Sequence, residues 1–263
     1  MAQLTARSLF LSAPAELRIQ IYEYLFDEAC NRILPIRNVN AGETPIGANS
    51  IRTRYHIMER SLFGRCYETT YELAKDDVYL CTALMRTNRQ VYNETVHLIY
   101  ARHAFDFGND VEAVAAFLSD LRPHSRQMVP EISVYKSAPS CTHRNELREW
   151  SSMCRYLEKH GGIRKLCLKV QGGKPKGQWQ GAQRLSVYDF EFLASIQHKS
   201  LEWVEYLCQI QGIQEIEVSS DVSLCPLPTS TDTILFAAFS ASIEDTFSSY
   251  LRMQLGLVDR YTS

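Results

Sequence analysis

The residues whose types suit metal binding gather in one part of the chain. They are Cys141, His143, Cys154 and His160. Thiolates and imidazoles are the usual ligands of structural zinc, but this group lacks the paired short spacings of such sites. None of the eight cysteines in the chain belongs to a CxxC pair. We therefore predict no metal site, and we interpret the scattered cysteines as free buried thiols, which favours a reducing compartment.

The stretch 171–181, QGGKPKGQWQG, is rich in glycine and lysine, which are the residues that phosphate-binding loops use. It lacks the G-x-x-x-x-G-K-[ST] pattern, and Pro175 removes one of the N–H groups that such a cradle needs. The G-x-S-x-G motif of a nucleophilic serine is also absent from the chain. We expect an exposed, mobile loop at 171–181 and a protein that is not an enzyme and uses no cofactor.

A basic stretch at 52–65 suggests nucleic-acid binding at first sight. Its cations are Arg52, Arg54, His56, Arg60 and Arg65, interleaved with the aromatic residues Tyr55 and Phe63. Glu59 and Glu68 dilute this charge, and the formal net charge of the whole chain is -2. We therefore predict a solvated face there, with no nucleic acid and no membrane as partner.

The composition is that of an ordinary soluble globular protein. The chain has 263 residues, of which 45% are hydrophobic and 22% are charged. That length gives one large domain or two small ones. No stretch approaches the roughly 20 apolar residues that span a bilayer, and the N-terminus does not resemble a signal peptide. We expect an intracellular protein, cytoplasmic or nuclear.

The most legible element is a helix at Leu11–Phe26. Pro14 suits its first turn, and Glu16 is favoured there by the helix dipole. Leu17, Ile21 and Leu25 recur every four residues and form an apolar stripe that Tyr22 and Phe26 widen. The polar residues Arg18, Gln20 and Glu23 lie off this stripe.

The remaining elements predict an α/β or α+β fold. We expect an irregular insertion at about Asn31–Asp77, in which a short strand at Arg32–Ile36 and a short helix or strand at Ser50–Glu59 stay open. A long helix at Leu80–Tyr100 and a strand that places Phe105 and Phe107 on one face follow. From there, helices at 111–121, 146–160, 190–211 and 232–255 alternate with strands at 131–135, 163–170 and 213–218. A parallel sheet built from β/α units follows, with a degenerate leucine-rich-repeat-like arrangement left open.

Two of these segments resemble F-box-like proteins. SAPAELRIQIYEYLF resembles the opening F-box helix, with Pro14, Glu16, Leu17, Ile21 and Leu25 at the matching positions. LMRTNRQVYNETVHLIYARHAFDF resembles a second block of F-box-like proteins of filamentous fungi, which carry Arg-Gln-x-x-x-Glu and Phe-x-Phe. The matching residues here are Leu84, Asn88, Arg89, Gln90, Glu94, Tyr100, Phe105 and Phe107. Ala13 and Asn88 depart from the family pattern, and the insertion separates the two blocks.

The resemblance implies a protein-interaction protein with two parts. Residues 1–110 would be an F-box-like helical module, and residues 111–263 an α/β region packed against it. Such proteins bind the adaptor subunit of a cullin ubiquitin ligase and present a protein substrate. On that basis we expect the helix face of Pro14, Leu17, Ile21, Tyr22 and Leu25 to bind a protein partner.

Other interpretations of the same residues stay open. The stripe of Leu17, Ile21, Tyr22 and Leu25 would alternatively pack inside the chain on Val91, Leu98 and Phe105. We expect Arg89 and Glu94 to have a structural role, through a salt bridge and hydrogen bonds that hold the insertion or the Phe105–Phe107 strand.

The alternative function is a ligand-binding or enzymatic α/β domain that uses the F-box-like motif only as a folding unit. Parallel α/β sheets bind their ligands at the carboxyl ends of the strands. The site of such a domain would therefore lie near Gln171–Trp179 and Ser219–Leu224. A deep polar pocket there would favour this alternative, and a shallow surface would argue against it.

Overall fold

The computed structural model describes residues 8–27, 33–40, 55–57, 67–73, 82–137, 144–176 and 184–257. Within them, seven strands form one sheet in the order β2-β3-β1-β4-β5-β6-β7. The strands are β1 Ile33–Asn40, β2 Tyr55–Ile57, β3 Tyr67–Leu73, β4 Ala104–Asp106, β5 Glu131–Lys136, β6 Lys165–Pro175 and β7 Glu215–Cys225. The neighbouring strands β1, β4, β5, β6 and β7 pair in parallel. Beyond β1, β3 and then β2 add to the sheet in antiparallel pairing. The predicted α/β or α+β class is confirmed.

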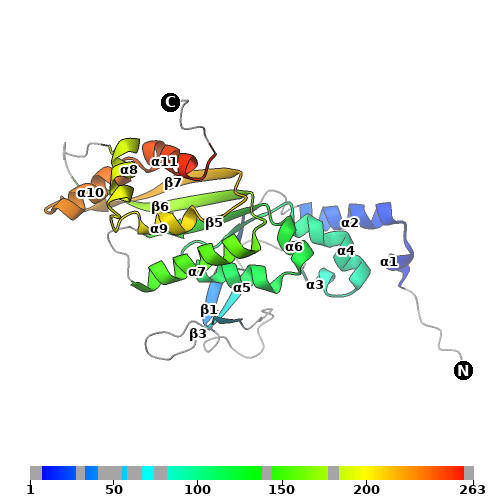
Figure 1. Ribbon diagram of the computed structural model, residues 1–263. Coiled ribbons are helices and arrows are strands. Elements are labelled where there is room, and N and C mark those ends of the chain that lie inside the picture. The colour runs from blue at the N-terminus through cyan, green and yellow to red at the C-terminus, as the bar shows by residue number, and fades with distance from the viewer. Residues whose placement is uncertain are drawn as a thin grey trace, which may run out of the picture.

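Helices connect these strands and also form a group of their own. They are α1 Leu9–Ser12, α2 Ala15–Asp27, α3 Thr82–Met85, α4 Arg89–Tyr100, α5 Glu112–Asp120, α6 Pro123–Met128, α7 Arg144–His160, α8 Val187–Ser195, α9 Glu202–Leu207, α10 Thr231–Ser240, the π-helix η2 Ile243–Phe247 and α11 Ser248–Gln254. Figure 1 shows α1, α2, α4 and α6 together at the right of the view, while α8, α10 and α11 lie at the left.

The stretch 31–77, predicted to be an irregular insertion, contributes strands to the sheet. Its first strand, β1, pairs in parallel with β4 through Ile33↔Ala104 and Leu34↔Phe105. Its other described strands, β2 and β3, extend the sheet beyond β1. The prediction of irregular structure was therefore wrong for β3, whereas β1 and β2 fall on Arg32–Ile36 and Ser50–Glu59, where a strand had been left open. Pro35 conceals the strand pattern of β1 in the sequence.

One face of the parallel sheet is covered and the other is polar. In β5, Ile132 and Val134 are fully buried, whereas the alternating Glu131, Ser133 and Tyr135 are only partly buried. β6 repeats the pattern. The parallel strands occur in chain order across the sheet, so crossovers of one hand place the connecting helices on one face. The opposite face is left to polar side chains.

The buried residues form two separate clusters. The larger fills the space between the sheet and α5, α7, α8, α9 and α11, and it includes the perpendicular pair Trp150 and Trp203. The smaller joins α2 to α3 and α4 through Tyr22, Phe26, Met85, Val91, Val96, Leu98 and Ile99. The predicted boundary near residue 110 cuts across the larger cluster, because Leu34 and Phe105 belong to it.

Two helices predicted as continuous are interrupted. In the Leu80–Tyr100 segment, α3 and α4 are separate because Asn88 adopts an extended conformation and accepts a hydrogen bond from the Gln90 N–H at 2.7 Å. This is an ordinary N-cap, so a new helix begins there. In the 190–211 segment, Gln197 has a φ of 51°, and this left-handed residue separates α8 from α9.

The last two strands are longer than predicted. β6 and β7 pair continuously from Lys165↔Glu215 to Pro175↔Cys225. Residues 171–175, expected in a mobile loop, are therefore strand, and 177–181 lie outside the described residues. Gly172 and Gly173 are buried because α10 packs directly on them. A Cβ on Gly173 would lie 2.5 Å from Cε1 of Phe236, so the glycine permits this close approach.

Candidate protein-interaction surface

The opening helix begins later than predicted. Ala13 is extended, with φ −67° and ψ 152°, and it separates α1 from α2. A residue that precedes proline is biased towards this conformation, so Pro14 accounts for the break. Pro14 itself is exposed immediately before α2, and Glu16 lies in the first turn of that helix.

The buried side of α2 is not the stripe that hydrophobicity indicates. Arg18, Tyr22 and Phe26 face inwards, with at most 6% of each residue exposed. They recur every four residues, and each comes one residue after Leu17, Ile21 and Leu25. The buried face of α2 is therefore turned about the helix axis, by one residue, from the face that those three apolar residues form. Arg18 was predicted to lie off the apolar stripe, but it lies on the same buried face as Tyr22 and Phe26, the residues that were expected to widen that stripe.

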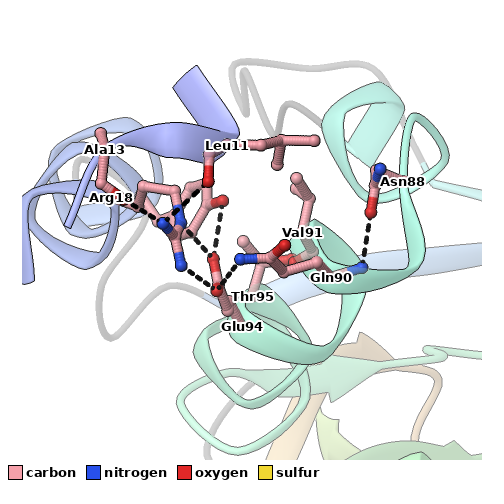
Figure 2. Close-up of polar contacts among 9 residues, drawn as sticks. Leu11, Ala13, Arg18, Asn88, Gln90, Val91, Glu94 and Thr95 are labelled. Atoms are coloured by element: carbon pink, nitrogen blue, oxygen red, sulfur yellow. Dashed lines mark hydrogen bonds and ion pairs between the residues drawn. The ribbon is translucent and has the colours of Figure 1, made fainter. Parts of the chain in front are cut away.

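The guanidinium of Arg18 is buried because Glu94 of α4 meets it with both carboxylate oxygens. Arg18 Nε donates to Oε2 at 3.0 Å, and Nη2 donates to Oε1 at 2.6 Å. The same guanidinium donates to the carbonyls of Leu11 and Ala13 (Figure 2). Arg18 therefore joins α4 to the turn between α1 and α2, with a two-pronged geometry that only arginine provides.

Two further side chains complete the environment of Glu94. Gln90, one turn earlier on α4, donates to Oε1 at 3.0 Å, and the Tyr22 hydroxyl donates to Oε2 at 3.0 Å. Each of the two carboxylate oxygens thus accepts two hydrogen bonds. The Gln-x-x-x-Glu spacing of the motif places Gln90 and Glu94 on one helix face, where the amide orients the carboxylate towards α2.

These contacts shift the ionisation of the groups involved. The hydrogen bonds from Arg18, assisted by those from Gln90 and Tyr22, lower the pKa of Glu94 to about 2. Burial, together with the hydrogen bond to Glu94, raises the pKa of Tyr22 to about 12. At neutral pH the pair is therefore a carboxylate and a neutral phenol, and α2 is held to α4 by a charged group at its centre.

The outer face of α2 carries apolar side chains that contact solvent. We define this α2 outer face as Leu17, Ile21, Tyr24 and Leu25, whose exposed fractions are 52%, 44%, 79% and 41%. Their spacing of four, seven and eight residues places them on one side of the helix. The alternative that the stripe packs on Val91 and Leu98 was wrong for Leu17, Ile21 and Leu25, which are exposed, but it holds for Tyr22, which packs with Val91 and Leu98.

The five residues predicted to bind a partner therefore fall into two groups. Pro14, Leu17, Ile21 and Leu25 are exposed, whereas Tyr22 is completely buried and contacts Glu94 and the ring of Phe10. Tyr24 was not among the predicted residues, although its position seven residues after Leu17 would have revealed it. Tyr22 shapes the surface by holding the helix and does not belong to it.

Arg89 and Glu94 were both predicted to have a structural role, and Glu94 has one, since its contacts with Arg18 and Tyr22 hold α2. Within the described residues, no hydrogen bond joins Glu94 to the insertion or to the Phe105–Phe107 strand. Arg89 is exposed at the start of α4. The burial of Arg18 could have been inferred from its position four residues before Tyr22 and eight before Phe26, which places all three residues on one face of the helix.

The other predicted sites have different locations. Cys154 is buried in the larger core and His160 is exposed, while Cys141 and His143 lie outside the described residues. No group of three or more potential ligands within the described ranges could hold a metal ion. Of the basic stretch 52–65, the described part is the strand β2, and the remaining cations fall outside it.

Of the site expected of an enzymatic domain, residues 171–175 and 219–224 are strand, and 177–179 lie outside the described residues. Gln171–Pro175 and Asp221–Cys225 hydrogen-bond to each other as strands. A nearby depression between the α8–α9 turn and α10, lined by His198, Asp232 and Phe236, encloses about 20 Å³. That volume holds about one water molecule and does not fit a substrate.

The fold and this surface define an α/β protein that presents an anchored amphipathic helix beyond one end of its sheet. A family model described as "Domain of unknown function (DUF7730)" matches residues 3–198, from before α1 to the α8–α9 turn. The chain therefore belongs to the DUF7730 family. No curated protein and no solved structure matches it significantly. No described helix has the length and apolar character needed to cross a membrane.

Proposed function

We propose that this protein is a non-enzymatic protein-interaction protein that binds a partner through the α2 outer face. The partner favoured by the F-box resemblance is the adaptor subunit of a cullin ubiquitin ligase, with the α/β region presenting a protein substrate. The observation that carries the proposal is the exposure of Leu17, Ile21 and Leu25 on a helix that Arg18 and Tyr22 hold in place.

The physical argument concerns the cost of exposing apolar area. A soluble helix normally turns its leucines and isoleucines towards the core, and here an arginine takes that place. Arg18 can be buried only because Glu94 pairs with it, so this arrangement leaves the apolar stripe available outside. An amphipathic helix with such anchors fits an apolar groove of a partner.

The location that fits this function is intracellular, cytoplasmic or nuclear. The four cysteines within the described residues, Cys154, Cys167, Cys208 and Cys225, are all free thiols. Free thiols persist in reducing compartments. The proposal includes no cofactor, nucleic acid or membrane as partner.

The test measures binding of the purified adaptor subunit by calorimetry or pull-down. Wild type should bind, and a Leu17→Asp, Ile21→Asp double variant should not. Burial of each side chain contributes about 1.5–3 kcal/mol, so loss of both weakens binding on the order of 100-fold or more. Since both residues are exposed, the variant should unfold at nearly the wild-type temperature.

A matched control uses exposed apolar residues on a different helix. Tyr188 and Phe192 of α8 are 80% and 63% exposed, and their replacement by aspartate should leave adaptor binding unchanged. If folded wild-type protein does not bind the adaptor, the ligase role is excluded. If the α2 double variant binds as wild type does, the α2 outer face is not the binding surface.

A further inference from the structure

Cations gather where α6 meets the C-terminal half of α7 (Figure 1). Residues 118–128 and 151–164 contain five lysines and arginines but only two carboxylates, Asp120 and Glu158. This leaves an excess of three positive charges, whereas the whole chain has a formal net charge of -2. We define the α6–α7 basic surface as Arg122, Arg126, Arg155, Lys159 and His160.

Within this surface, the cations occur in pairs one helical turn apart. Arg122 and Arg126 are separated by four residues, and so are Arg155 and Lys159. Residues at this spacing are neighbours on a helix, where like charges repel and destabilise it. No ion pair within the described residues includes any of these four side chains. The arrangement therefore costs stability in the free protein, and a bound anion would relieve the repulsion.

Neutral groups hold the two arginines of the first pair in place. The guanidinium of Arg122 lies over the ring of Tyr92, 4.6 Å from its centre. Arg126 donates from Nε to the Leu118 carbonyl at 2.9 Å and from Nη2 to the Leu121 carbonyl at 3.4 Å. A carboxylate in these positions would neutralise the guanidinium, whereas rings and carbonyls orient it and leave its charge available.

His160 joins the two helices and shows how little negative charge is close to this surface. Nη1 of Arg126 lies 3.3 Å from Nδ1 of His160. A guanidinium can only donate, so Nδ1 is the acceptor and the neutral ring carries its proton on Nε2. Partial burial and the charges of Arg126 and Lys159 lower the pKa of His160. Glu158 comes two residues before His160, so it lies on the side of α7 away from α6.

The surroundings indicate which class of anion fits this surface. Nucleic acids bind with their bases stacked on aromatic rings, but Arg122 covers Tyr92 and His160 lies 4.6 Å from the ring of Tyr156. Anionic membranes take up exposed apolar side chains, but residues 82–137 and 144–165 present no large exposed hydrophobic residue. A carboxylate needs neither feature, and its two oxygens match the fork of a guanidinium.

We propose that the α6–α7 basic surface binds an acidic segment of another protein, rich in aspartate and glutamate. Two of its carboxylates would pair with Arg122 and Arg126, and others would lie against Arg155 and Lys159. The spacing fits an extended segment. Cations four residues apart on a helix are separated by about 6 Å along its axis, and alternate side chains of an extended chain are separated by about 6.6 Å.

The test uses a short fluorescent synthetic peptide in which glutamate alternates with serine. Its binding to the full chain is measured by anisotropy at low salt. The wild-type protein should bind this peptide, and a matched peptide with glutamine in place of glutamate should bind at least tenfold more weakly. Binding should also weaken as salt is added, because exposed charges are screened.

A charge reversal on α7 locates the site. Arg155→Glu with Lys159→Glu changes two exposed residues and should weaken peptide binding by about tenfold or more at low salt. The matched control is Lys174→Glu with Lys176→Glu, which alters the net charge equally at exposed positions of a different element. This control should bind the peptide nearly as wild type does.

A second variant examines the arginines of α6. Arg122→Gln with Arg126→Gln removes both guanidinium forks and should weaken binding by about tenfold as well. Arg126 also caps backbone carbonyls, so thermal unfolding establishes that this variant is folded. The α7 variant decides the question on its own if the α6 variant does not fold.

Four results would overturn the inference. They are equal binding of the glutamine peptide, wild-type binding by the folded α7 variant, an equal loss in the Lys174→Glu, Lys176→Glu control, and tighter binding of a single-stranded oligonucleotide of the same charge. Sedimentation gives one further check. If wild type forms a dimer that the α7 variant dissociates, the surface belongs to a second copy of the chain and the inference is wrong.

The inference does not depend on the ligase role, because α6 and α7 are separate from the α2 outer face. The Leu17→Asp, Ile21→Asp variant should retain peptide binding. The Arg155→Glu, Lys159→Glu variant should retain adaptor binding.

Discussion

Replacement of Gly173 by alanine should destabilise the protein, although a glycine-to-alanine change within a strand normally does the opposite. Alanine restricts the unfolded chain and usually contributes about 0.4–1 kcal/mol of stability where the backbone allows it. At Gly173 the new Cβ would lie 2.5 Å from Cε1 of Phe236 and 3.1 Å from Sγ of Cys225. Contacts this short force one of the two neighbours to move.

The movement is costly because the backbone is fixed on both sides of the contact. The Gly173 N–H donates to Ser240 Oγ at 2.9 Å, and that hydroxyl donates to the Phe236 carbonyl at 2.7 Å. Strand and helix therefore cannot separate without loss of the bond between Gly173 and Ser240. Overpacking of this kind costs about 1–3 kcal/mol. At this chain length, each kcal/mol lowers the melting temperature by roughly 2–4 °C.

Urea unfolding followed by circular dichroism measures the effect. A Gly173→Ala, Phe236→Leu double variant removes the ring atom that clashes, so it should be more stable than expected from the sum of the two single changes. If Gly173→Ala is as stable as wild type, or if Phe236→Leu brings no recovery, close packing of α10 on β6 is not what requires a glycine.

Three further predictions concern ionisable groups. The pKa of Glu94 is about 2 in the folded chain against an ordinary value of 4.5. The stability that this carboxylate contributes is therefore complete above pH 4.5 and is lost as the pH falls towards 2. In thermal melts, Glu94→Gln should abolish this part of the acid dependence of stability. Tyr22→Phe removes a hydrogen bond to a charged group and should lower the free energy of unfolding, measured in urea, by about 1.5 kcal/mol. Because the pKa of Tyr22 is raised to about 12 in the folded chain, the wild type loses stability as the pH rises from 10 to about 12, and the variant should lose less. Burial and the S–H hydrogen bond to Glu131 raise the pKa of Cys167 to about 12, so Glu131→Gln should accelerate its alkylation at mildly alkaline pH, as measured by mass spectrometry; an unchanged rate would contradict this role of Glu131.

The sequence revealed the elements whose side chains alternate between a buried and a polar environment. Glu131–Tyr135 and the Phe105–Phe107 pair were predicted as strands because one face of each is apolar. The distal half of β7 was missed for the converse reason. Residues 219–225 carry polar groups on one face and exposed apolar groups on the other, so no buried periodicity marks them.

The orientation of α2 could not be predicted, because its inward face depends on a partner far along the chain. Arg18 becomes a buried residue only when Glu94 lies against it, 76 positions later. Hydrophobicity ranks Leu17 and Ile21 above an arginine, and a local pattern contains no information on that distant carboxylate. The helix itself was predictable, whereas the side that it offers to solvent was not.

The pairing of β1 with β4 has a consequence for the way in which the chain folds. A contact between α2 and α4 on its own must close a loop of 76 residues, which is entropically costly. Ile33 of β1 pairs with Ala104 of β4, and these strands begin only a few residues after α2 and α4 end. Once that pairing has formed, the remaining loop between the two helices is short. Because the β1–β4 pairing closes a loop of nearly the same length, the two contacts share one entropic cost: whichever forms first makes the other much less costly, so the α2 outer face and the β1–β4 pairing are expected to form and to be lost together.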